Sequence, residues 1–188
     1  LLVDDDVTGG TVTLGDGSSF EVDGGTVTSA VASDASGADA QTFTLTSGTM
    51  SGNVSLGAGI DAVTLSAGAM SGDLDLGTGA DTLALNGATV AGDIDGGTGT
   101  DTATLGANFT TAGAIANVEL IDVNGNTLTV ESAITGGGAT YGVSGIDVNG
   151  GTLELNNGGS FAGSIFDTGV GGLLDVGADA GGGTFTLG

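Results

Sequence analysis

The stretch that decides the fold is LGTGADTLALNGATVAGDID, residues 76–95, because nearly the same phrase precedes it and begins again after it. Residues 56–75 read LGAGIDAVTLSAGAMSGDLD, and residues 96–105 read GGTGTDTATL. The copies align without a gap, so the same residue types recur in fixed frame: Gly57, Gly77 and Gly97; Gly59, Gly79 and Gly99; Asp61, Asp81 and Asp101; Leu65, Leu85 and Leu105. A gap-free period of this kind is typical of repeat proteins, in which each repeat is one structural unit.

Within each repeat, the local pattern is that of short β-strands separated by glycine turns. Residues 42–46 (TFTLT), 82–85 (TLAL) and 127–130 (TLTV) alternate apolar with small polar residues, which is the two-residue period of a half-buried strand. Clusters of Gly, Asn and Asp between them supply the backbone conformations that tight turns need. No stretch of useful length has the period of a helix. The sequence therefore predicts an all-β chain.

Repeats of about 20 residues cannot bury an apolar face alone, but they can do so when stacked. We therefore expect a parallel β-helix (β-solenoid) with one repeat per coil, right-handed by the general rule for parallel connections. Alternation assigns the interior to three coils: Met50, Val54, Leu56, Val63 and Leu65; then Met70, Leu74, Leu76, Leu83 and Leu85; then Val90, Ile94, Ala103 and Leu105. Gly96 replaces the leucine of the other copies, so the core is expected to be thinner there.

We interpret residues 1–188 as one continuous solenoid domain with three sections. Residues 1–40 are loosely repetitive, and residues 41–106 hold the strict repeat. In residues 107–188 the frame loosens, because IDVNGNTLTV at 121–130 and IDVNGGTLEL at 146–155 recur at a wider spacing. Longer, irregular coils are expected in that last section.

The composition excludes several functions. The 188 residues include 41 Gly and 23 Asp plus Glu, but no Lys, Arg, His, Cys or Pro, which gives a formal net charge of -23. Binding to nucleic acid or to an anionic membrane surface depends on Lys and Arg, so neither is expected. No apolar run approaches the roughly 18–20 residues that cross a membrane, so we expect no membrane insertion of this segment. Without Cys the chain has no disulfides.

Stacking creates an electrostatic problem at the repeated aspartates. Asp61, Asp81 and Asp101 would follow one another at the coil spacing of about 4.8 Å. Two carboxylates at that distance repel by about 0.9 kcal/mol in bulk water, and several-fold more at an effective dielectric constant of 20. Because the chain has no basic side chain, three remedies remain: raised pKa values, full solvation or bound cations. Calcium prefers carboxylates and backbone carbonyls, which glycine turns expose.

The third copy also resembles a known family. Residues 96–104, GGTGTDTAT, match the nonapeptide G-G-x-G-x-D-x-apolar-x of RTX calcium β-rolls, and residues 56–64 and 76–84 match it with Leu in place of the first Gly. With one nonapeptide per coil, the chain is closer to RTX-like solenoids that bind calcium on one side only. SGDLDLGTGADTL, residues 71–83, resembles passenger repeats of bacterial autotransporters. The resemblance implies a secreted bacterial solenoid with Ca²⁺ as a cofactor, and its implied metal ligands are Asp61, Asp81 and Asp101 with carbonyls near Gly57, Gly59, Gly77, Gly79, Gly97 and Gly99.

A second interpretation of the same aspartates needs no metal. An Asp in a turn accepts hydrogen bonds from backbone amides, and an exposed column of carboxylates is screened by salt and aids solubility. The sequence leaves calcium binding and this turn-forming role open. A second acidic set, Asp73 with Asp75 and Asp93 with Asp95, points to one face by alternation and is expected to be solvated.

The function that the sequence favours is structural. The chain is not expected to be an enzyme, since only carboxylates and hydroxyls are available; Asp73 with Asp75 is the nominal pair for an alternative polysaccharide-acting β-helix. An ice-binding RTX-like solenoid is another alternative, with Thr78 and Thr98 in a loop row that Ala58 interrupts. We expect an extracellular protein of a bacterial cell surface, a fibre subunit, stalk or adhesin segment. Its expected partners are further copies of itself or neighbouring solenoid segments, stacked end to end.

Overall fold

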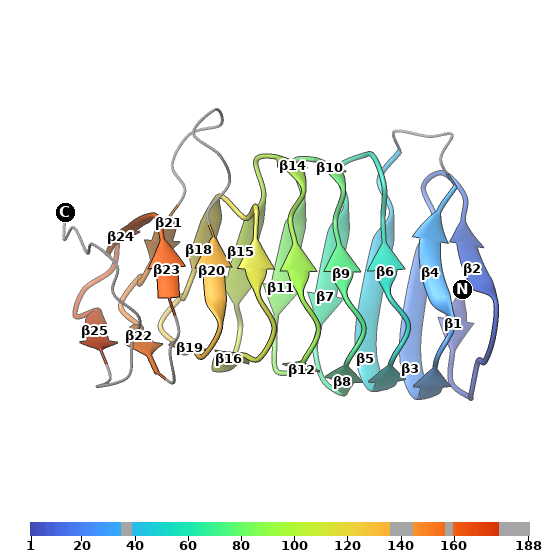
Figure 1. The fold of residues 1–188 in the computed structure, drawn as a ribbon, viewed down its shortest axis with the longest axis horizontal. Helices are drawn as coiled ribbons and strands as arrows, with labels where there is room; N and C mark the ends of the chain where they lie inside the picture. The colour runs from blue at the N-terminus through green and yellow to red at the C-terminus, as the bar shows by residue number, and fades with distance from the viewer. Residues whose placement is uncertain (35–38, 136–144, 157–159, 177–188) are drawn as a thin grey trace.

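The computed structural model describes residues 1–34, 39–135, 145–156 and 160–176, and within these residues the chain is a parallel β-solenoid without a helix (Figure 1). The chain advances along one axis from its N-terminal to its C-terminal coil, and each strand pairs in parallel with its counterpart in the next coil. The prediction of an all-β parallel solenoid is confirmed.

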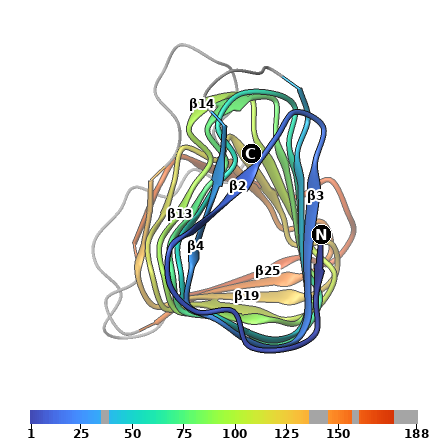
Figure 2. The same ribbon diagram turned by 90° about the vertical axis from the view of Figure 1, so that its right-hand side faces the viewer.

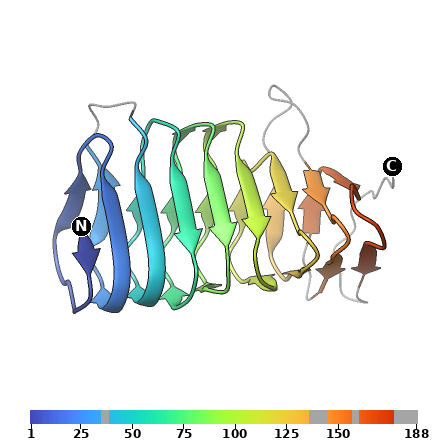
Figure 3. The same ribbon diagram turned by 180° about the vertical axis from the view of Figure 1, so that it is seen from behind.

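Seen along its axis, the solenoid has three sides (Figure 2). One side is the largest sheet, which Figure 3 faces; in order it contains β1 (Leu2–Val3), β3 (Ser19–Val27), β5 (Thr42–Met50), β7 (Ala62–Leu65), β11 (Thr82–Leu85), β15 (Thr102–Leu105), β18 (Leu120–Asp122), β21 (Gly145–Asp147) and β24 (Ser164–Phe166), with β8 (Ala69–Met70) and β12 (Thr89–Val90) attached to it.

The second side is a sheet of β2 (Thr11–Leu14), β4 (Ala30–Ser33), β6 (Val54–Ser55), β9 (Leu74–Asp75), β13 (Ile94–Asp95), β17 (Ile115–Ala116), β20 (Ala133–Thr135) and β23 (Ser160–Ala162). In the C-terminal coils the third side is a sheet of β16 (Phe109–Thr111), β19 (Thr127–Val130), β22 (Thr152–Leu155) and β25 (Leu173–Val176). A pair of short strands, β10 (Thr78–Gly79) and β14 (Thr98–Gly99), lies at the corner between the first two sides (Figures 1 and 2).

The strict repeat stacks in register. Ala62 of β7 pairs with Thr82 of β11, and Thr82 pairs in turn with Thr102 of β15. The later coils depart from this frame, because Thr102 pairs with Leu120 but Leu120 pairs with Gly145. One coil is therefore shorter than the repeat and the next is longer. The longer coil is the one that the wide recurrence of IDVNG predicted, since Ile121 pairs with Ile146.

The interior consists of the residues that alternation assigned to it. All of the predicted inward residues of the three regular coils are buried, from Met50 to Leu105. At the N-terminal side, the rings of Phe20 and Phe43 stack with their centroids 6.1 Å apart and continue the same core. Burial of large apolar side chains is the main favourable term in folding, and here it extends along the whole axis.

The repeated glycines are explained by close stacking of the corner loops. A Cβ atom built on Gly79 would lie 1.6 Å from the carbonyl oxygen of Gly59, and one built on Gly99 would lie 1.4 Å from that of Gly79. These distances leave no room for any side chain, so the loops reach coil spacing only because each position is glycine. The G-x-G frame is thus a steric requirement of the solenoid, independent of any metal.

Candidate functional site

The repeated aspartates lie inside the solenoid. Asp61, Asp81 and Asp101 each stand one residue before a strand of the largest sheet, at the corner that carries β10 and β14. Their exposed fractions are 0%, 1% and 0%. Each Asp lies two residues before a buried core residue, so the alternation of the strand turns it inward. The interpretation of these residues as a solvated column is therefore wrong.

A ladder of hydrogen bonds connects these carboxylates to the neighbouring coil. The backbone N–H of Asp81 donates to Oδ1 of Asp101 at 2.8 Å, and that of Asp61 donates to Oδ1 of Asp81 at 2.7 Å. The N–H of Gln41 donates to Oδ1 of Asp61 at 2.6 Å. Each carboxylate thus satisfies a backbone donor at the corner of the preceding coil, where an unpaired N–H would be costly.

Two members of this ladder were missed by sequence reasoning. Gln41 occupies the position of the Asp one repeat earlier, and it is fully buried. Glu119 follows at the other end, where Oε2 of its carboxylate accepts from the N–H of Asp101 at 2.7 Å. The frame itself could have revealed Gln41, since QTFTL aligns with DAVTL; Glu119 required knowledge of the shortened coil. We call Asp61, Asp81, Asp101 and Glu119 the acid column, with Gln41 at its N-terminal end.

The second carboxylate oxygen of each Asp in the column has no partner. Oδ2 of Asp61, Asp81 and Asp101 is buried without a hydrogen bond, as are both polar atoms of the Gln41 side chain. Burial raises the pKa of Asp61, and it raises the pKa of Asp81 and of Asp101 to about 6, against the lowering effect of the backbone hydrogen bonds. Carboxylates that are buried and incompletely paired are expensive in their charged form.

These orphaned oxygens are of the chemical kind that a hard cation requires. The carbonyl oxygens of Gly57 and Gly77 lie in the adjoining loops, where each accepts one backbone N–H, at 2.7 Å and 2.8 Å, and keeps a second lone pair. In the described ranges no group of three or more acidic side chains is placed to hold a metal ion. Oxygen donors for a cation would have to come from carboxylates of successive coils together with carbonyl oxygens, the types of donor that calcium takes.

The other acidic set lies outside. Asp73, Asp75 and Asp93 are exposed, as the alternation predicted, whereas Asp95 is half-buried and accepts a hydrogen bond from the Asn117 side-chain amide. They form an external ladder of their own, because the N–H of Asp73 donates to Oδ1 of Asn53 and the N–H of Asp93 donates to Oδ1 of Asp73, both at 3.0 Å. Asp73 and Asp75 thus share one outer surface, with water to screen their charges.

Within the described part of the chain, no helix has the length and apolarity needed to cross a bilayer. No family model matches the chain, and neither a curated protein nor a solved structure matches it, so the solenoid is assigned to no family.

Proposed function

We propose that this chain is a non-enzymatic structural segment of an extracellular bacterial surface protein, a rod whose coils continue end to end and are held together by calcium. The observation that carries the proposal is the acid column. The second carboxylate oxygen of Asp61, Asp81 and Asp101 is buried without a hydrogen bond, and the sequence contains no Lys, Arg or His to compensate the charge.

At neutral pH the column needs a cation. With pKa values of about 6, Asp81 and Asp101 are mostly ionised at pH 7, inside a core and next to each other. At a separation of about 4.8 Å their repulsion reaches about 3.5 kcal/mol at an effective dielectric constant of 20. Calcium sites of extracellular modules bind with dissociation constants of about 10⁻⁴–10⁻³ M, which suffices where calcium is abundant. This requirement supports a location outside the cell.

The arrangement of apolar side chains supports a rod that continues at its ends. Among the described residues, the exposed large apolar side chains other than Ile60 belong to the first and the last described coil: Leu1 and Leu2 in the first, and Val170, Leu173 and Val176 in the last. The strands β1 and β25 are the outermost of their sheets and pair on one side only within the described ranges. Open strand edges of this kind favour pairing with a further strand.

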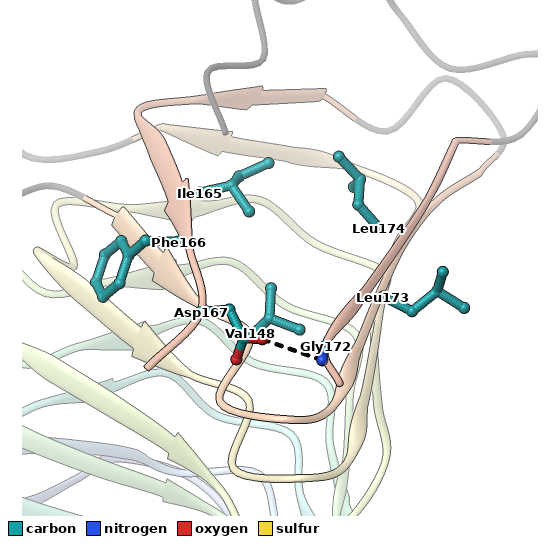
Figure 4. A pocket seen from close by; sticks show the side chains of 7 residues that line it. All are labelled: Val148, Ile165, Phe166, Asp167, Gly172, Leu173 and Leu174. Carbon is teal, nitrogen blue, oxygen red and sulfur yellow. Dashed lines mark hydrogen bonds between the residues drawn. The ribbon is translucent and has the colours of Figure 1, made fainter. Parts of the chain in front are cut away.

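Cavities open at the same two coils. At the N-terminal coil a cavity of about 220 Å³ is lined by residues 1–7 and Val12. At the C-terminal coil a cavity of about 90 Å³, shown in Figure 4, is lined by Val148, Ile165, Phe166, Asp167, Gly172, Leu173 and Leu174. The turn beside it is held by Asp167, whose pKa is lowered because its carboxylate accepts the N–H groups of Gly150, Gly172 and Gly169. A further coil, from a second copy or from a neighbouring solenoid segment, would cover both surfaces.

Calcium is expected to raise the melting temperature of the protein at pH 7 by about 5–11 °C relative to EDTA. A ligand that binds only the folded state at one hundred times its dissociation constant adds about 2.7 kcal/mol per site. A domain of this size gains roughly 2–4 °C for each kcal/mol. The measurement is thermal unfolding followed by circular dichroism, first in EDTA and then with excess Ca²⁺.

The control is Mg²⁺ at the same concentration, which should act more weakly because it gives up its water ligands reluctantly. Sedimentation velocity over the same titration reads out assembly, and we expect the sedimentation coefficient to rise with protein concentration. Identical melting curves in EDTA and Ca²⁺ would refute the calcium component. Monomers at all concentrations would refute end-to-end stacking.

A second candidate function, ice binding, is favoured by the threonines of the largest sheet. The loop row is interrupted as expected, because Ala58 is bridged to Thr78. However, β5, β7, β11 and β15 stack in register and carry two outward columns: Thr42, Ala62, Thr82 and Thr102, and beside it Thr44, Thr64, Ala84 and Thr104. Each column is interrupted by one alanine, but the two columns together present hydroxyl and methyl groups at coil spacing on one sheet, an arrangement that suits a surface of ordered water.

This candidate predicts that the protein slows ice recrystallisation and that Thr82→Tyr, in the middle of the array, abolishes the effect. The matched control is Thr129→Tyr on β19, which lies on a different side of the solenoid. The readout is crystal growth in a frozen sucrose film. Growth equal to that in buffer for the unmodified protein would eliminate the candidate.

A further inference from the structure

The chain contains four Asn-Gly pairs, at residues 86–87, 124–125, 149–150 and 157–158, and the last of these lies outside the described residues. An Asn-Gly pair can modify itself. The backbone nitrogen of the glycine attacks Cγ of the asparagine side chain, and the side-chain nitrogen leaves as ammonia together with the proton of the glycine N–H. Water then opens the resulting succinimide ring at either of its carbonyls, which leaves aspartate or isoaspartate. Glycine favours this reaction because it has no Cβ to obstruct the ring.

The pair at residues 124–125 is held at both reacting groups. The side-chain amide of Asn124 donates to the carbonyl oxygen of Leu105 at 3.2 Å. The N–H of Gly125 donates to the carbonyl oxygen of Asn149 in the next coil at 3.1 Å. Both hydrogen bonds must open before the ring can close, so the fold protects this pair.

The pair at residues 149–150 is protected in the same way. The side-chain amide of Asn149 donates to Oδ1 of Asp122 at 2.9 Å. The N–H of Gly150 donates to Oδ1 of Asp167, also at 2.9 Å. Here too, the nucleophile and the leaving group are both engaged by other residues.

The pair at residues 86–87 is free at both groups. Asn86 and Gly87 are exposed, in the turn between β11 and β12. The N–H groups on either side of Gly87, those of Asn86 and Ala88, donate to the carbonyl oxygen of Leu65 at 2.8 Å and 3.5 Å. Within the described part of the chain, no hydrogen bond holds the Gly87 N–H or the Asn86 side-chain amide.

The turn at Gly87 also has room to rearrange. A cavity of about 360 Å³ is lined by Gly87 with residues 88–91, 108–110 and 112. The φ of Gly87 is 128°, a conformation that glycine adopts readily and other residues rarely do. A turn that borders open space can change its backbone angles without displacing the core.

From this arrangement we infer that Asn86 is a site of self-modification in the folded protein, where the chain converts the side-chain amide into a carboxylate through a succinimide. The aspartate product adds a negative charge to the exposed turn. The isoaspartate product adds one backbone atom to the connection between β11 and β12. The reaction needs only water, so this inference is independent of the proposed calcium-held rod.

The test is incubation of the folded full chain in mildly alkaline buffer, followed by mass spectrometry of its chymotryptic peptides, since the chain has no Lys or Arg for trypsin. Conversion adds one mass unit, and chromatography separates isoaspartate from aspartate. We expect Asn86 to convert roughly tenfold or more faster than Asn124 and Asn149, because two hydrogen bonds protect each of the latter pairs.

The control for the role of the fold is the same incubation in urea, where the three pairs should convert at similar rates. Asn86→Ser, which copies Ser66 of the preceding coil, should abolish the mass gain in the peptide that begins at residue 86 and so assigns that gain to Asn86. Equal rates at the three pairs in the folded protein would overturn the inference. A preference for Asn86 that is as strong in urea as in the folded protein would also overturn it, because the selectivity would then not come from the structure.

Discussion

Metal-free protein is expected to become less stable as the pH rises from about 4 to about 7, with a fall in melting temperature of roughly 5–10 °C. Burial raises the pKa of Asp61 above its ordinary 3.8, and that of Asp81 and Asp101 to about 6. A carboxyl whose pKa is higher in the folded than in the unfolded chain holds its proton more tightly when folded. Its stabilising contribution is complete below pH 3.8 and is lost as the pH rises through 6. Melting curves in EDTA across this range measure the effect.

Every charged group near these carboxyls acts in the same direction. Asp61, Asp101 and Asp75 raise the pKa of Asp81, and Glu119 and Asp95 raise that of Asp101. Because no basic side chain exists, none of the neighbours reverses the sign.

Two double variants separate the column from the general acidity of the chain. The double variant Asp81→Asn, Asp101→Asn should weaken the dependence of the melting temperature on pH. The double variant Asp73→Asn, Asp93→Asn removes the same charge from exposed positions and should leave that dependence unchanged. Both pairs retain a side-chain oxygen for the backbone N–H that each residue caps. If the melting temperature of the two double variants depended equally on pH, the acid column would not be the cause of the pH dependence.

The architecture could be predicted from the sequence because one physical constraint repeats. The fixed frame between repeats places the same residue types on top of one another in successive coils. The two-residue alternation within each strand then decides which of them point into the core. Met70 and Leu74, for example, were assigned to the core from their parity alone and are buried. The longer coil between Ile121 and Ile146 followed from the recurrence of IDVNG, but the shortened coil before it could not be predicted, because turns change in length without changing the strand pattern.

The candidate site was harder to predict because burial of the aspartates contradicts their polarity. The alternation that places Val63 inside also places Asp61 inside, but a carboxylate is normally expected in solvent. The repeated glycines pointed to a metal-binding motif, yet the stacked loops require them for steric reasons alone. Glu119 could not be assigned to the column without the register of β18, which the sequence does not encode in a regular spacing.

Asp81→Asn is expected to have opposite effects in the absence and in the presence of calcium. In EDTA at pH 7, the variant removes the central charge of the column and relieves its repulsion from Asp61 and Asp101. The asparagine still offers Oδ1 to the N–H of Asp61, so the ladder remains intact. We expect the melting temperature to rise by about 3–5 °C.

With excess Ca²⁺ the same substitution should lower the melting temperature relative to the unmodified protein. Asp81 lies between Asp61 and Asp101, so in the proposed calcium-held column its carboxylate would be a ligand shared by cations on both of its sides, and we expect the calcium-induced rise in melting temperature to fall by more than half. The sign of the change in melting temperature distinguishes the possible roles of Asp81.

If Asp81 only shaped the turn, the substitution would have the same small effect on the melting temperature in EDTA and in Ca²⁺. If the column were stabilised by protons alone, the substitution would be favourable in both. Only a residue that binds a cation, and whose charge destabilises the protein when no cation is present, gives a variant with a higher melting temperature in EDTA and a lower one in Ca²⁺. The control Asp73→Asn, on the outer face, should change the melting temperature in neither direction.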